Sequence, residues 1–252
     1  MTNGSFMRSA AFGTFLLLPL STGWSNVKVT RKPVEVEHKT FDRNDPPKEL
    51  GLEKEGAVTV SEFDLQIGLG IAPGEKIPQR NGKCQQSMVI QSVNLTLGLK
   101  ITVWLPDNAT DKLKAHEEGH LLMAEKVYAE RADKAARAAG ALIDGRRMTA
   151  EADNCDDVDK AMEQTIGEAN KKVYHAYLTK TADVSARAGE IYDDVTKHGT
   201  RMDIDEKTAS AQAFDREADE ERQATTKPAS GASKTTTKPS AHTEMDPLQI
   251  KK

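Results

Sequence analysis

The 252-residue sequence has little of several features that mark whole classes of protein. Its 35 Lys and Arg residues stand against 39 Asp and Glu, so the net charge of -4 gives no basic excess to neutralise a phosphate backbone. The long apolar run at the N-terminus is too short to span a bilayer. Only 37% of residues are hydrophobic and 5% aromatic, so part of the chain is expected to stay outside any core. These shortages argue against nucleic acid as a partner and exclude an integral membrane protein.

The N-terminal apolar run has the organisation of an export signal. A positive charge precedes the apolar residues 10–20, and the small residues Ser-Thr-Gly follow them at the spacing that signal peptidase accepts. We expect residues 1–23 to be a signal peptide, with cleavage before Trp24. The mature chain is then periplasmic or secreted and has no membrane segment. A buried N-terminal helix is the alternative, but glycines and a proline interrupt it.

Cysteine is also scarce, since the chain has only two. Both Cys84 and Cys155 remain after signal cleavage, and an oxidising compartment favours a single disulfide between them. Because the closed loop is long, such a bridge is worth roughly 3 to 5 kcal/mol of stability. The alternative is a pair of buried free thiols.

Short alternating or β-branched runs fill the first third of the mature chain, at residues 27–36, 57–69 and 88–104. Turn residues separate these runs, including Ala-Pro-Gly at 72–74 and Asn-Gly at 81–82, which favours a hairpin. We therefore expect three strands here, most simply in a small antiparallel β-sheet.

The second half of the chain has helical composition. Residues 111–139 are dense in Ala, Leu, Lys, Glu and Arg, and glycine follows them. A second helix is expected to open near Thr149 and to run past Tyr177, and residues 184–197 predict a third. The predicted fold is α+β, with the sheet packed on a helical half in one domain. From residue 203 apolar periodicity is lost, so we expect residues 203–252 to be a flexible polar tail, although 203–220 can also continue a helix.

The motif H-E-x-x-H occurs inside the strongest predicted helix, at residues 116–120. Four-residue spacing puts His116 and His120 one turn apart on the same helix face, where both imidazoles can bind one cation. Glu117 then borders the open coordination position of that cation. The chemistry implied is hydrolysis by zinc-activated water, with Glu117 as general base. Two histidines on a solvated helix face are the bland alternative.

The third zinc ligand lies outside this motif. The metzincin extension requires Gly and His where this chain has Met123 and Lys126, so that subclass is excluded. Later His, Glu and Asp side chains are candidates, and spacing alone does not choose among them. The candidates are His175, His198, Glu168, Glu190, Asp193 and Asp194.

Three features together resemble a bacterial family of uncharacterised secreted zinc-dependent proteases, which is a domain of unknown function. They are the helical H-E-x-x-H at 116–120, Cys155 early in the following helix, and a closing Y-D-x-x-T-x-H-G at 192–199. The resemblance covers residues 27–202. It implies a zincin-like domain and favours His198 as the third zinc ligand.

The sequence thus predicts a zincin-like domain over residues 24–202 that acts as an exported zinc-dependent metallohydrolase. The most direct activity for this site is cleavage of a peptide or protein in the cell envelope or outside the cell, with Zn²⁺ as cofactor. The alternative is a secreted, non-catalytic binding protein of the envelope whose metal site is structural or absent.

Overall fold

The structure is a computed structural model that describes residues 26–48, 56–201 and 203–226. The predicted signal peptide, its cleavage site and the polar residues 227–252 lie outside the described residues. The elements are β1 Val27–Arg31, β2 Glu35–Phe41, β3 Val58–Pro78, β4 Cys84–Pro106, α1 Asp111–Glu130, α2 Ala132–Gly140, β5 Arg147–Ala152, α3 Val158–Thr179, α4 Ala182–Thr196 and α5 Glu206–Thr226. The α+β class predicted from the sequence is confirmed.

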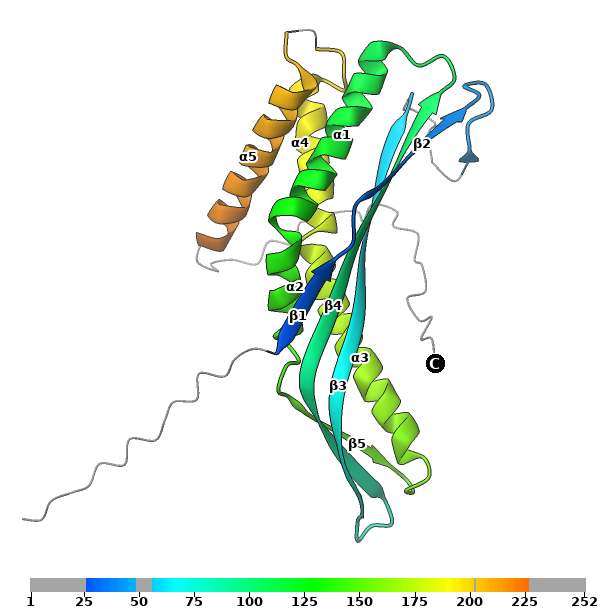
Figure 1. Cartoon of the computed structure of the whole chain (residues 1–252), viewed down its shortest axis with the longest axis vertical. Coiled ribbons are helices and arrows are strands. Elements are labelled where there is room, and N and C mark those ends of the chain that lie inside the picture. The colour runs from blue at the N-terminus through cyan, green and yellow to red at the C-terminus, as the bar shows by residue number, and fades with distance from the viewer. Residues whose placement is uncertain (1–25, 49–55, 202, 227–252) are drawn as a thin grey trace, which may run out of the picture.

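The long strand β4 is the centre of a mixed five-stranded sheet (Figure 1). Strands β3 and β5 pair with β4 in antiparallel fashion, whereas β1 and β2 run parallel to it. The prediction of a purely antiparallel sheet was therefore wrong. Strands β2 and β3 do run in opposite directions, but β4 inserts between them. This insertion puts β1 and β2 beside a strand that runs in their own direction.

The β3–β4 hairpin is longer than the apolar runs predicted. It turns at the expected Asn-Gly pair, where Gly82 has a φ of +85° and Gln79 N donates to Lys83 O at 2.7 Å. The turn residues at 72–74 do not end β3. They lie at a register shift between Pro73 and Lys76, after which pairing resumes. A β-bulge of this kind lets a strand continue past residues that cannot follow regular pairing.

One face of the sheet carries the core. Every second residue of β4 is buried against the helices, namely Val93, Leu95, Leu97, Leu99, Ile101 and Val103. The residues between them point to the opposite face, where Asn94 and Lys100 are exposed. Gly98 and Thr102 are also buried, but the overall alternation is that expected of a sheet that packs mainly on one side. The helices therefore cover one face of the sheet (Figure 1).

The predicted helix at 111–139 is confirmed, with a break at Arg131 that divides it into α1 and α2. The start predicted for the second helix, near Thr149, was wrong. Thr149 belongs to strand β5, and α3 begins only at Val158. Because Ala150 of β5 is buried in a small core, the local pairing with β4 outweighs the helix propensity of residues 149–152. The third predicted helix is confirmed as α4.

The predicted disulfide is confirmed. Cys84 at the start of β4 is bonded to Cys155 in the segment before α3, across 71 residues of sequence. No free cysteine remains. The bridge lies at the end of the hairpin far from the N-terminus of α1, beside a small core of Met88, Ala150 and Met162.

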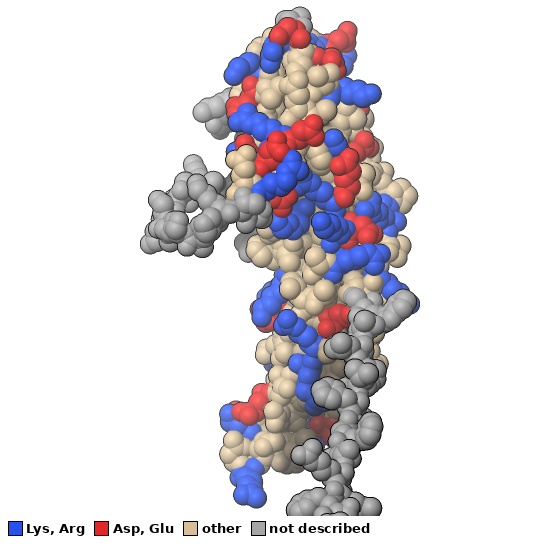
Figure 2. All heavy atoms as spheres, turned by 90° about the vertical axis from the view of Figure 1, so that its left-hand side faces the viewer, with Lys and Arg blue, Asp and Glu red and all other residues tan. Residues whose placement is uncertain are grey.

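The ordered fold extends beyond residue 202, where the sequence predicted a polar tail. Residues 206–226 form α5, which packs on α1 and α4 with Ala209, Ala213 and Phe214 buried. Two of these are alanines, which contribute little to an apolar pattern. The sequence of this helix therefore gave no clear apolar periodicity. Lys and Arg are mixed with Asp and Glu on the face shown in Figure 2. Arg131 pairs with Glu217 of α5 at 2.6 Å.

None of the helices in the described part of the chain has the length and apolarity required to cross a membrane.

Candidate metal centre

The H-E-x-x-H motif lies in the N-terminal half of α1. The helix begins after Thr110, whose hydroxyl accepts a hydrogen bond from Leu113 N at 3.2 Å, and this N-cap satisfies one of the free amides of the first turn. His116 is 6% exposed and His120 is half-buried on the same side of the helix. The helix therefore presents both imidazoles to α4.

Asp193 of α4 completes a group of three possible metal ligands. Its Oδ1 lies 3.2 Å from His116 Nε2 and 3.1 Å from His120 Nε2. One ligand atom from each residue lies within 4.8 Å of the other two. Two ligands that are each about 2.1 Å from a tetrahedral zinc ion lie about 3.4 Å apart, so the two distances from Asp193 to the histidines are compatible with a shared ion. Two imidazoles and one carboxylate are also a donor set that zinc accepts.

The charge state of Asp193 suits a ligand. Burial alone would raise the pKa of its carboxyl, but hydrogen bonds to His116 and His120, together with the charge on their rings, hold that pKa well below its usual range. The carboxylate is therefore ionised at neutral pH, as a metal ligand must be.

Tyr192 packs the two histidines into place. Its ring stacks on His116 with centroids 5.1 Å apart and meets the edge of His120 at 4.9 Å. Its hydroxyl donates to His116 O at 3.2 Å. Burial raises the pKa of the Tyr192 phenol, which keeps this donor protonated. A side chain at Gly119 would collide with the Tyr192 ring and hydroxyl, so the glycine inside the motif makes this close packing possible.

The chain turns sharply at the end of α4 and returns to His116. Lys197, His198 and Gly199 all have positive φ angles, of 54°, 52° and 73°. A Cβ at Gly199 would lie 3.0 Å from His116 Cγ, so backbone covers that face of the imidazole. Thr196 supports the turn because its hydroxyl accepts a hydrogen bond from Gly199 N at 3.3 Å. The closing motif at 192–199 thus builds one wall of the site.

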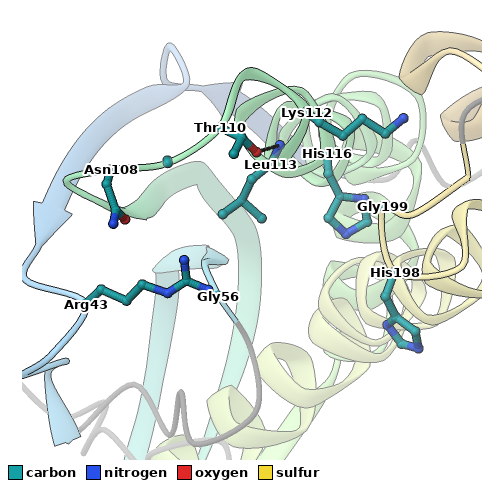
Figure 3. A pocket seen from close by; sticks show the side chains of 10 residues that line it. Arg43, Gly56, Asn108, Thr110, Lys112, Leu113, His116, His198 and Gly199 are labelled. Atoms are coloured by element: carbon teal, nitrogen blue, oxygen red, sulfur yellow. Dashed lines mark hydrogen bonds between the residues drawn. The ribbon is translucent and has the colours of Figure 1, made fainter.

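The favoured third ligand, His198, lies outside the group of three. Its side chain is exposed and points away from His116 (Figure 3). Asp193, one of the alternatives left open by the sequence, takes the position between the histidines. The other candidates are exposed on α3 and α4 and are not in the group, namely His175, Glu168, Glu190 and Asp194.

Glu117 is buried beside the histidines, with 4% of its surface exposed. Thr59 of β3 donates from its hydroxyl to Glu117 Oε2 at 2.8 Å and lies 3.1 Å from Glu117 O. Burial raises the pKa of Glu117, while the charge on His120, the Thr59 hydrogen bond and the charge on His116 oppose the rise. A carboxylate with a raised pKa is a stronger base than an ordinary one.

Sequence reasoning missed two residues that shape this site. Thr59 is 58 positions before Glu117 and belongs to no motif, so no local pattern marks it. Gly119 carried a signal, since a glycine in the interior of a strong helix costs stability and calls for a packing reason.

A pocket of about 270 Å³ opens beside His116 (Figure 3). His116 and Gly199 form one side of it, and Leu113 with the start of α1 forms another. Arg43, from the segment after β2, and Asn108 form the far side. The cavity is large enough for part of a small molecule or peptide, and one of the three candidate ligands, His116, lines it.

Comparisons with protein-family models, with curated proteins and with solved structures found no match to this chain.

Proposed function

We propose that this protein is a zinc-dependent metallohydrolase, most directly a peptidase. The observation that carries the proposal is the convergence of both histidines of a helical H-E-x-x-H on Asp193, with Glu117 buried next to them. Two histidines and one carboxylate are the protein ligands of known zinc peptidase sites. The resemblance of residues 27–202 to secreted zinc-dependent proteases supports the same activity.

Zinc would be held by His116, His120 and Asp193. Among the described residues this group has three members, which leaves a coordination position for water or substrate. A structural site in a non-catalytic binding protein would be closed by a fourth protein ligand. When bound, zinc supplies Lewis acidity, which polarises a carbonyl group and makes water more acidic.

Glu117 is the general base of the proposed reaction. Its carboxylate accepts the proton of the attacking water and passes it to the nitrogen of the leaving amine. The Thr59 hydrogen bond restricts the carboxylate to one position, which reduces the reorganisation needed at each proton transfer. Tyr192 and Gly199 take no part in this proton transfer. They pack against the histidine rings that would hold the metal and fix the positions of those rings.

We also propose that the protein acts in the periplasm or outside the cell, on a peptide or protein substrate. The signal-like residues 1–23 and the Cys84–Cys155 disulfide both support an oxidising compartment.

The test compares Glu117→Gln with Glu118→Gln. The two carboxylates are adjacent, but Glu117 is buried beside the histidines and Glu118 is exposed. We expect Glu117→Gln to bind zinc as the wild type does and to lose about 10² to 10⁴ in kcat, because the amide cannot accept the proton. Glu118→Gln should retain wild-type kcat. Zinc content and cleavage of a mixed peptide library provide the measurements.

Two results would contradict the proposal. One is a wild type that binds no zinc at the micromolar level or cleaves no peptide in its presence. The other is equal loss of cleavage in both variants, which would mean that local charge and not the base at Glu117 controls the reaction.

A further inference from the structure

The pocket beside His116 has an uneven distribution of charge. Among the described residues that line it, Arg43 and Lys112 are cationic and none is Asp or Glu. This is unexpected for a chain in which acidic residues outnumber basic ones. The start of α1 also borders the pocket, and the positive end of a helix dipole adds to the same field.

Only one of the two cations is available to a ligand. The Lys112 amine lies 3.1 Å from Glu206 and donates to Arg201 O at 2.8 Å, so its charge is already compensated. Arg43 has no hydrogen bond or ion pair within the described part of the chain. Figure 3 shows its side chain extended into the space between Asn108, Gly56 and Leu113. The side-chain amide of Asn108 likewise has no intramolecular partner there.

We propose that this pocket binds a carboxylate group of the peptide substrate, with Arg43 as the specificity-determining residue. The guanidinium matches a carboxylate through two parallel hydrogen bonds, and the Asn108 amide can donate a third. Because His116 borders the same pocket, a carboxylate held at Arg43 would share this cavity with one of the candidate metal ligands. This inference rests on the proposed peptidase function and names its substrate class.

The carboxylate has two possible sources, an acidic side chain or the free C-terminus of the substrate. Peptide pairs that differ only in Glu or Gln near the scissile bond test the first source. Peptides with a free or an amidated C-terminus test the second. For one of the two pairs, we expect wild-type kcat/KM to favour the carboxylate by roughly ten- to a hundredfold, the range for a hydrogen bond to a charged group.

The variant that tests the pocket is Arg43→Gln, and its matched control is Arg80→Gln. Arg80 is exposed in the turn between β3 and β4, so this control removes the same charge far from the site. Arg43→Gln should reduce the carboxylate preference to about one, whereas Arg80→Gln should keep the wild-type ratio.

A binding measurement separates this inference from the peptidase proposal. Full-length protein with Glu117→Gln and excess zinc is titrated with the same labelled peptides, and fluorescence anisotropy gives each Kd. Cleavage without any carboxylate preference would overturn the pocket assignment and leave the peptidase proposal standing. Absence of cleavage would contradict the peptidase proposal, and the pocket assignment would then be decided by Kd. Equal Kd values for both members of each pair, or a preference unchanged by Arg43→Gln, would overturn it.

Discussion

The two ends of this molecule are held together by different means. At one end, α1 and α4 enclose polar side chains, and the packing of Tyr192, Gly119 and Gly199 fixes two histidines in place. At the other end, the hairpin tip, β5 and α3 share a core of only a few residues, and the Cys84–Cys155 bridge ties them covalently.

The difference shows what each end needs. A metal site must hold its ligands within a fraction of an ångström, so the residues around the ligands must pack closely against them. The far end has no ligands to position, but its core contains only a few apolar residues. The disulfide lowers the entropy of the unfolded chain and so supplies stability that a larger core would otherwise provide. Four predictions test this comparison, in order of decreasing effect.

The largest effect is expected from loss of the disulfide. Replacement of Cys84 and Cys155 by Ser should lower the free energy of unfolding by roughly 3 to 5 kcal/mol, because the bridge closes a loop of 71 residues. Urea denaturation measures this change. Zinc affinity should stay near the wild-type value. If zinc binding is lost before the protein unfolds, the two ends do not behave independently.

Removal of the third ligand should weaken metal binding at the other end. Asp193→Ala is expected to lower zinc affinity by at least about a hundredfold, or about 2.7 kcal/mol, since the histidines alone leave the site incomplete. His198→Ala is the comparison variant, because its exposed side chain lies outside the ligand group. Competition with a chelator gives both affinities. A larger loss in His198→Ala would restore that histidine as the ligand favoured by the family resemblance.

The packing beneath the histidines is tested by Gly119→Ala. The new methyl group would collide with Tyr192, so we expect a loss of roughly 1 to 3 kcal/mol in stability. Gly167→Ala is the matched control, because that helical glycine has open space around its Cβ position. The control should gain up to about 1 kcal/mol from its better helix propensity. Similar unfolding midpoints for the two variants would show that Tyr192 is not tightly packed.

The smallest effect is expected at the ion pair of Lys76 and Asp159, whose charged atoms are 2.7 Å apart near the disulfide. The side chains of Lys76 and Asp159 are 36% and 64% exposed, so Lys76→Met should cost only about 0 to 1 kcal/mol, and added salt should remove most of that difference. Thermal unfolding at low and high ionic strength measures it. A cost comparable to loss of the disulfide would mean that charge, and not the cross-link, holds this end.

Much of the site was visible in the sequence because it depends on local spacing. His116, Glu117 and His120 belong to one helix, and helical geometry alone puts the two imidazoles on one face. The disulfide could also be predicted from the sequence, since two cysteines allow only one pairing. The third ligand was not, because its choice depends on how α4 packs against α1. Asp193 precedes the end of α4 and faces the histidines, whereas His198 lies within the left-handed turn and faces away from His116.

The sequence by itself determined the α+β class, the helix that carries the motif, the hairpin turn at Gly82 and the cysteine pair, because each follows from local periodicity, turn chemistry or composition. Only the tertiary structure decided that β4 separates β2 from β3, that residues 149–152 form a strand and that α5 belongs to the fold. It alone also brought Thr59 to Glu117 and Asp193 to the histidines. These contacts join residues far apart in the chain, and their energies come from burial and pairing that no local segment encodes.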